Sequence, residues 1–105
     1  MKKLILLFAI LAQTAWGQEW YEDGSLHKST IKEWHRSTPS NRLATAADWA
    51  AVIYKQELLR SNSWEEDLYY YSKRLVRCIN TATKGVYSVY GNQTVSIAAA
   101  CDALE

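Results

Sequence analysis

The first seventeen residues constrain the fold most, because they decide how much of the chain remains to fold and in which compartment. Two lysines precede an apolar run over residues 4–12, which is roughly half as long as the about 20 residues that a membrane-spanning helix needs. The small residues Ala15 and Gly17 stand three and one positions before Gln18, a spacing typical of a signal peptidase site. The segment therefore predicts a secretory signal peptide, residues 1–17, cleaved between Gly17 and Gln18, with no stable membrane anchor afterwards.

The mature chain, residues 18–105, is expected to be a single helical domain in the bacterial periplasm or the external medium. With about 88 residues it buries only a modest share of its surface, so a covalent cross-link helps it to stay folded. Cys78 and Cys101 are the only cysteines, and in an oxidising compartment they favour a disulfide over a metal site, for which further ligands are lacking. Closing a loop of about 24 residues stabilises a fold by about 3 kcal/mol in the chain-entropy model.

Helix start signals divide the mature chain into an N-terminal arm and four helical segments. Residues 18–29 combine aromatic and turn residues without a lasting period, so we expect an extended arm. Each helical segment follows a residue that can cap a helix: 31–36 after Thr30, 39–60 after Thr38, 64–84 after Ser63, and a last helix after Asn92. Glu33 and Glu66 complete two capping boxes. Residues 86–90 alternate like a strand, but an isolated strand has no hydrogen-bonding partner, which favours a loop.

The apolar residues of the longer segments recur at helical spacing and define three faces that we expect to form the core. These faces are Leu43, Ala47, Ala50, Tyr54 and Leu58; then Leu68, Tyr71, Leu75, Ile79 and Ala82; and finally Ile97, Cys101 and Leu104. The alanine-rich segment 39–60 suits a monomer core and a dimer interface equally well. The sequence therefore predicts an all-α fold, a small helical bundle of three to four helices stapled by one disulfide.

Tryptophan and tyrosine supply the first candidates for partner contact. Trp49 and Tyr54 lie within the alanine-rich segment and are expected in the core. Trp20, Tyr21 and Trp64 lie at segment ends, where contact with a partner is more plausible than within a helix, since aromatic side chains anchor many protein interfaces; packing within the chain is the alternative.

Three consecutive tyrosines, residues 69–71, spread over roughly 200° of a helix, so the middle one, Tyr70, must point away from the core. Four cations are expected on this outer face, and Arg74 is spaced for a cation–π contact with Tyr70. Such a face suits an acidic protein, an anionic glycan or a phosphate backbone; a solvated surface is the alternative. The complete candidate partner face comprises Tyr70, Lys73, Arg74, Arg77, Lys84, Trp20, Tyr21 and Trp64.

Other patterns argue against catalysis, metal binding and nucleic-acid binding. The chain has no GxSxG, HExxH or glycine-rich phosphate motif, and the acidic run 65–67 is explained by its place at a helix start. His27 and His35 are eight residues apart, so they do not lie on adjacent helical turns as metal ligands would. Loss of the two signal-peptide lysines changes the formal charge from +1 to −1, which disfavours a polyanion-binding role.

We therefore predict a non-catalytic module of the protein-interaction or inhibitor/immunity type, without a cofactor, that binds another envelope protein. Two alternatives remain open from the sequence. One is a carrier that holds an apolar or aromatic small molecule between helices, with tryptophan and tyrosine lining the pocket. The other is an acid-stress periplasmic chaperone that exposes apolar surface as its carboxylates become protonated.

Overall fold

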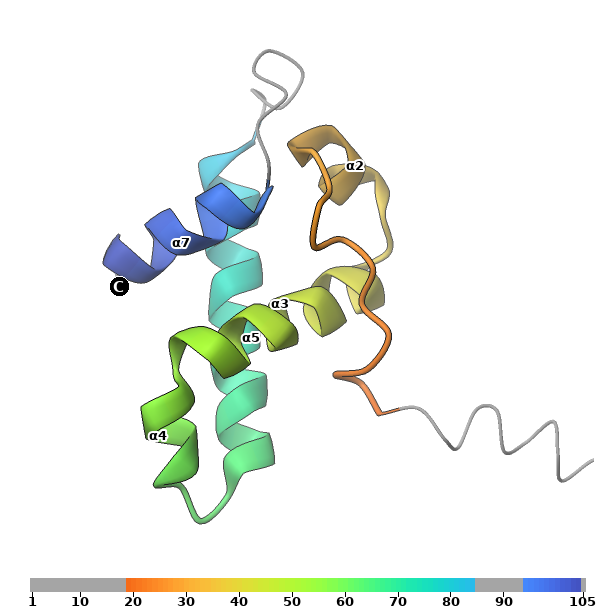
Figure 1. Cartoon of the computed structure of the whole chain (residues 1–105). Coiled ribbons are helices and arrows are strands. Elements are labelled where there is room, and N and C mark those ends of the chain that lie inside the picture. The colour runs from red at the N-terminus through yellow and green to blue at the C-terminus, as the bar shows by residue number, and fades with distance from the viewer. Residues whose placement is uncertain (1–18, 85–93, 105) are drawn as a thin grey trace, which may run out of the picture.

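The computed structural model of the chain describes residues 19–84 and 94–104, and these ranges form an all-α structure (Figure 1). Their five helices are α2 (Ile31–Arg36), α3 (Pro39–Ile53), α4 (Lys55–Leu59), α5 (Trp64–Ala82) and α7 (Thr94–Leu104). Cys78 on α5 and Cys101 on α7 form a disulfide. The predicted all-α class and the predicted disulfide are confirmed.

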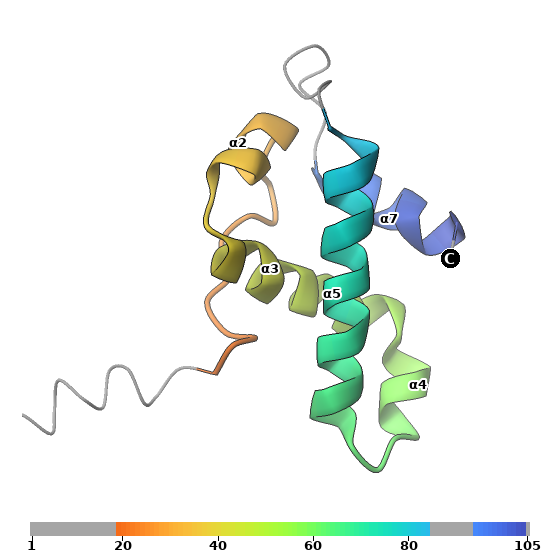
Figure 2. The ribbon, with the colours of Figure 1, turned by 180° about the vertical axis from the view of Figure 1, so that it is seen from behind.

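Helix α5 is the longest of the described helices, and α3 and α7 pack against one side of it. Helices α3 and α7 both lie in front of α5 in Figure 1 and behind it in Figure 2, where the view is reversed. Helix α3 packs chiefly against α5, and α5 also packs against α7. The side of α5 that faces the viewer in Figure 2 is therefore covered by no described helix.

The core lies where α3 crosses α5. Ala46, Ala47 and Ala50 are fully buried there, because their small side chains let the two helices approach closely. The core cluster also takes residues from the arm, α2, α5 and α7: Leu26, Trp34, Leu68, Leu75, Ile79, Ala98 and Cys101. The alanine-rich face is thus used within one chain. On the predicted face of α5, Leu68, Leu75 and Ile79 are buried and Tyr71 packs against the core. Ala82 is exposed, and the next residue, Thr83, is buried instead and contacts His35.

The N-terminal arm is irregular, as predicted, and it is docked along α3. The backbone N–H of Leu26 donates to the buried hydroxyl of Thr45 at 3.1 Å, and that of Ser25 donates to Asn41 Oδ1 at 2.9 Å. At its far end the Ser29 hydroxyl donates to the hydroxyl of Thr94, the first residue of α7, at 3.0 Å. Hydrogen bonds to two helices therefore hold the arm in place.

The starts of α2 and α3 are those predicted. The Thr30 hydroxyl accepts the Glu33 N–H at 3.1 Å, and the Glu33 carboxylate accepts the Thr30 N–H at 2.9 Å, which completes the capping box. At α3 the Thr38 hydroxyl accepts the Asn41 N–H at 3.1 Å, and Pro39 lies in the first turn.

The predicted helix over 39–60 is interrupted, and α4 follows as a separate short element. At Tyr54 the backbone leaves helical geometry, with φ −107° and ψ 28°. The Tyr54 ring stacks on the ring of Tyr71 in α5, with centroids 4.0 Å apart. A tertiary contact thus accompanies the break, and local helix propensity does not predict such a contact.

The start of α5 is at the expected residue but is capped differently. Ser63 holds the N-cap position, yet its side chain accepts no hydrogen bond, so the predicted capping box with Glu66 is wrong. Instead, Ser61 accepts the Ser63 N–H at 2.9 Å and donates its hydroxyl to Asp67 at 2.6 Å. Ser61 therefore accepts the N–H of Ser63 that the predicted capping box assigned to the Glu66 carboxylate.

The far end of α5 lies at Ala82, two residues before the predicted end. The predicted cap at Gly85, the loop over 86–90 and the cap at Asn92 lie outside the described residues. Among the described helices, none is long and apolar enough to cross a membrane.

Candidate functional site

The candidate residues predicted from the sequence fall into two neighbouring groups. Trp20, Tyr21 and Trp64 come together with a fourth ring, Tyr69, at the start of α5; we call these four residues the aromatic junction. Tyr70, Lys73, Arg74 and Arg77 follow one another along α5, and we call them the basic stripe. Lys84 is exposed but lies beyond the end of α5, so helical spacing does not place it on the stripe.

The aromatic junction fastens the arm to α5 through edge-to-face contacts. The Trp20 ring lies 5.3 Å from that of Tyr21 and 5.0 Å from that of Tyr69, while Tyr21 lies 5.7 Å from Trp64. Trp20 and Tyr21 pack against the core on one side, but Trp64 and Tyr69 remain 48% and 42% exposed. The junction therefore presents large apolar rings to solvent in a fixed arrangement.

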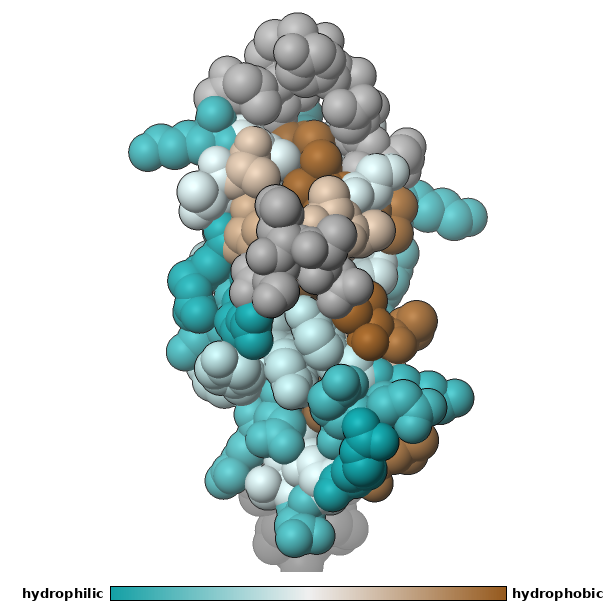
Figure 3. All heavy atoms as spheres, turned by 90° about the vertical axis from the view of Figure 1, so that its left-hand side faces the viewer, coloured by the Kyte–Doolittle hydropathy of each residue, from teal (hydrophilic) through white to brown (hydrophobic). Residues whose placement is uncertain are grey.

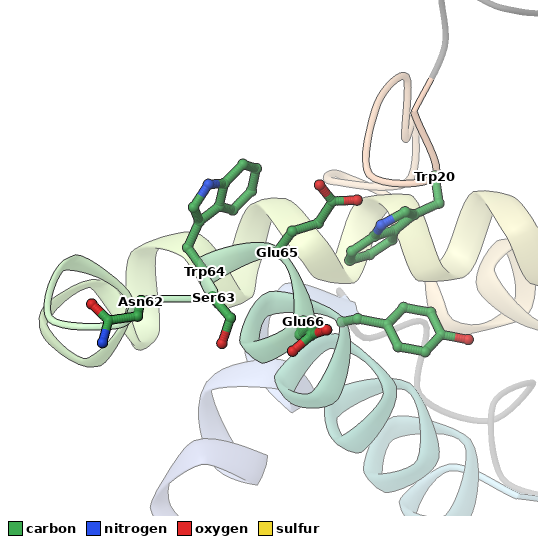
Figure 4. A pocket seen from close by; sticks show the side chains of 7 residues that line it. Trp20, Asn62, Ser63, Trp64, Glu65 and Glu66 are labelled. Carbon is green, nitrogen blue, oxygen red and sulfur yellow. The ribbon is translucent and has the colours of Figure 1, made fainter.

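A cleft of about 570 Å³ opens beside the junction (Figure 4), and it is lined by Trp20, Asn62, Ser63, Trp64, Glu65, Glu66 and Tyr69. Figure 4 shows the carboxylate of Glu65 between the indoles of Trp64 and Trp20. Within residues 19–84 and 94–104, no hydrogen bond or ion pair engages the carboxylates of Glu65 or Glu66. The cleft thus combines aromatic walls with uncompensated negative charge.

The carboxylates near the cleft also act on the neighbouring phenol of Tyr21. Its pKa is raised above the usual value, first by desolvation and then by the carboxylates of Glu19, Glu65 and Glu22. Carboxylates from the arm and from α5 thus act on one position. Acidic side chains are therefore gathered at this end of α5.

Tyr70, in the basic stripe, points outward and contacts Arg74, as predicted from the sequence. Tyr70 is 56% exposed, and the Arg74 guanidinium carbon lies 5.3 Å from the centre of its ring, which confirms the predicted cation–π contact. The Lys73 ammonium lies 4.9 Å from the ring of Tyr69, so a second contact links the stripe to the aromatic junction. Negative charge at the start of α5 therefore passes into positive charge farther along the same helix.

Sequence reasoning missed Tyr69, which it placed neither in the core nor on the partner face. Its spacing of four from Lys73 was an available signal for a side-by-side contact on a helix. It also missed the exposed apolar residues Val52 and Leu59. A groove of about 420 Å³ runs along α4 between Ala51 and Trp64, and Figure 3 shows apolar surface on one flank of the side where α4 and α7 lie.

The two histidines are engaged in separate contacts. His27 Nε2 lies 2.6 Å from Asp48 Oδ2, and His35 Nε2 lies 2.6 Å from the hydroxyl of Thr83. The Thr83 hydroxyl donates to the Ile79 carbonyl, so His35 must be the donor in this pair. In the part of the chain that the structure describes, no three His, Cys, Asp or Glu side chains are grouped to hold a metal ion.

The described residues define an all-α, disulfide-linked protein, and its aromatic junction and basic stripe lie at the start of α5 and along it. Comparisons with protein-family models, with curated proteins and with solved structures give no match to this chain. The candidate site therefore stands on its own geometry.

Proposed function

We propose that this chain is an exported, non-catalytic protein-interaction module that binds another envelope protein through the outer side of α5. One observation carries the proposal: half-exposed aromatic rings and charged side chains adjoin one another on a helix whose outer side no described helix covers. Interfaces are enriched in tryptophan, tyrosine and arginine, which is the composition of this surface. The aromatic junction and the basic stripe are the two parts of the proposed binding surface.

The sign of the charge on this surface changes along α5. Glu65 and Glu66 precede Tyr70 along α5, and the basic residues Lys73 and Arg77 follow it. Charge patterns of this kind fix the register of a complex and exclude wrong partners more than they raise affinity. We therefore propose a specific partner, oriented by the acidic residues at the start of α5 and the basic residues farther along it.

Export is part of the proposal. The apolar segment 4–12 and the site between Gly17 and Gln18 favour secretion into the periplasm or the medium. The disulfide between Cys78 and Cys101 supports an oxidising compartment. The mature chain is proposed to act there as one small helical bundle.

The carrier alternative receives less support from the geometry. The clefts beside the aromatic junction and along α4 are open to solvent, whereas carriers enclose most of the surface of a small ligand. Open clefts with rings and charges at their rims are better suited to side chains of another protein.

Capture from envelope extract tests the proposal. The tagged protein is purified natively after export, as wild type and as Tyr70→Ala, Arg77→Gln and Lys32→Gln variants. Lys32 is an exposed cation on α2 and serves as the charge-matched control for Arg77. We expect wild type and Lys32→Gln to retain the same protein, and the two stripe variants to lose it.

Two results would contradict the proposal. One is equal capture by all four proteins, which would show that the outer side of α5 is not used. The other is the absence of any captured protein together with a stoichiometric organic compound in a solvent extract, which would favour the carrier.

A further inference from the structure

We propose that the cleft beside the aromatic junction binds an arginine side chain of the partner protein. This inference rests on the proposed function and states which chemistry the partner presents. We call the site the acidic aromatic cleft, and its working residues are Trp20, Trp64, Glu65, Glu66 and Tyr69.

The walls of the cleft match a flat cation. A guanidinium group is planar, weakly hydrated and stacks on aromatic faces, and tryptophan gives the strongest cation–π attraction. Figure 4 shows the indoles of Trp20 and Trp64 on either side of Glu65. The edge-to-face contacts of Trp20 with Tyr69 and of Tyr21 with Trp64 hold both indoles in position before a partner arrives.

The carboxylates supply the opposite charge. Within the described ranges, Glu65 and Glu66 have no hydrogen-bonding or ion-pair partner of their own. A carboxylate accepts two parallel N–H bonds from one guanidinium, which fixes the orientation of the side chain as well as its charge. A lysine ammonium cannot make this fork or stack flat on an indole, so arginine is favoured over lysine.

An anion is disfavoured at the same place, although the start of a helix usually attracts one. The positive end of the α5 dipole already faces three acidic residues, Glu65, Glu66 and Asp67. The partner groups of the site are therefore cationic, even though the stripe that follows along α5 is basic.

The basic stripe indicates which charge the partner carries next to this arginine. Lys73 lies over Tyr69, one of the rings that line the cleft, so the cleft and the stripe adjoin. If an arginine of the partner occupies the cleft, a neighbouring part of the partner lies over Lys73 and Arg77. We therefore expect an acidic segment near that arginine.

A peptide titration tests the inference without knowledge of the partner. The exported, disulfide-bonded protein is titrated with acetyl-Gly-Arg-Gly-amide, while the indole N–H signals of its tryptophans are followed by NMR. Matching peptides carry lysine or citrulline, which has the shape of arginine but no charge. We expect the arginine peptide to shift the Trp20 and Trp64 signals, and the citrulline peptide to bind about tenfold more weakly or not at all.

Variants locate the binding. Glu65→Gln and Trp64→Leu should each weaken the arginine peptide about fivefold or more, whereas Arg77→Gln should not weaken it. Both cleft side chains are exposed, so these variants should stay folded, and the unchanged amide spectrum of the core checks this.

Equal binding of arginine and citrulline peptides would overturn the inference, as would unchanged binding in both cleft variants or no binding of the arginine peptide at all. The outcome is separable from that of the capture experiment. A failed titration with capture that still depends on Tyr70 and Arg77 removes the arginine cleft and leaves the interaction module. A specific titration without any captured protein keeps the cleft and contradicts the proposed function.

Discussion

Two pairs of tryptophans differ in their surroundings: one pair lies in the core, and the other lies at the acidic aromatic cleft. Trp34 and Trp49 stack in the core with ring centres 5.7 Å apart, and the Trp34 indole N–H donates to Asn80 Oδ1 at 2.8 Å. Trp20 and Trp64 make edge contacts with tyrosines, beside a carboxylate that has no partner among the described residues.

Burial of the ring and a hydrogen bond from its indole N–H distinguish the tryptophans that stabilise the fold from those that remain available for binding. Trp34 is completely buried, and its one polar atom is satisfied, so it contributes to the free energy of unfolding. Trp64 is 48% exposed and contributes less to folding, which leaves its surface available for a partner.

The largest effect is expected from the core tryptophan. Trp34→Ala should lower the free energy of unfolding by about 4 kcal/mol, because it leaves a large cavity and an unpaired Asn80. Trp64→Ala should cost about 1 kcal/mol or less, since it removes one edge contact. Urea unfolding of both variants measures the difference, and equal losses would break the comparison.

The disulfide is expected to come next. Replacement of Cys78 and Cys101 together by alanine should lower the free energy of unfolding by about 3 kcal/mol, because the unfolded chain loses a constraint on its loop. Thermal and urea unfolding of the oxidised wild type and the double variant measure it. A loss below about 1 kcal/mol would show that packing of α7 holds the fold without the bridge.

Gly24 lies where the arm touches α3, so a substitution there acts both on the packing of α3 and on the arm that carries Trp20. A methyl group there would lie 2.4 Å from the Thr45 backbone nitrogen, which cannot move without shifting α3. Gly24→Ala should therefore lower the free energy of unfolding by about 2 kcal/mol and shift the indole signal of Trp20, which the arm carries. Lys28→Ala, at an exposed arm residue, is the control, and an unchanged Trp20 signal in Gly24→Ala would show that the junction is held independently of the arm's docking.

The smallest effect concerns pH. Burial first, and then the positive charge of Arg42, lower the pKa of His35 below its usual value. The unfolded state therefore takes up a proton more readily, so the free energy of unfolding should fall as the pH drops below about 6.5. His35→Gln should flatten this decrease between about pH 7.5 and 5.5, as followed by urea unfolding at several pH values. An unchanged slope would contradict the assignment.

Local signals predicted the parts of the fold that depend on neighbouring residues. The capping box at Thr30, the start of α3 at Pro39 and the outward face of Tyr70 all follow from spacings of a few residues. The break at Tyr54 could not be predicted in this way, because it accompanies stacking on Tyr71, seventeen positions away in the chain.

The candidate site divides in the same manner. The contact of Arg74 with Tyr70 follows from helical spacing and was predicted. The contact of Trp20 with Tyr69 joins an arm without a period to a distant helix, so no local pattern indicates it. Glu65 was explained by its place at a helix start, and only the folded arrangement brings its carboxylate between two indoles.

The central claim, that the outer side of α5 binds a partner, is tested most directly by site-specific photo-crosslinking in intact cells. A photoreactive phenylalanine derivative replaces Tyr70 in one strain and Lys32, on α2, in another. We expect a discrete adduct with one envelope protein from position 70 and none from position 32. The absence of an adduct at position 70, or the same adduct from both positions, would contradict it.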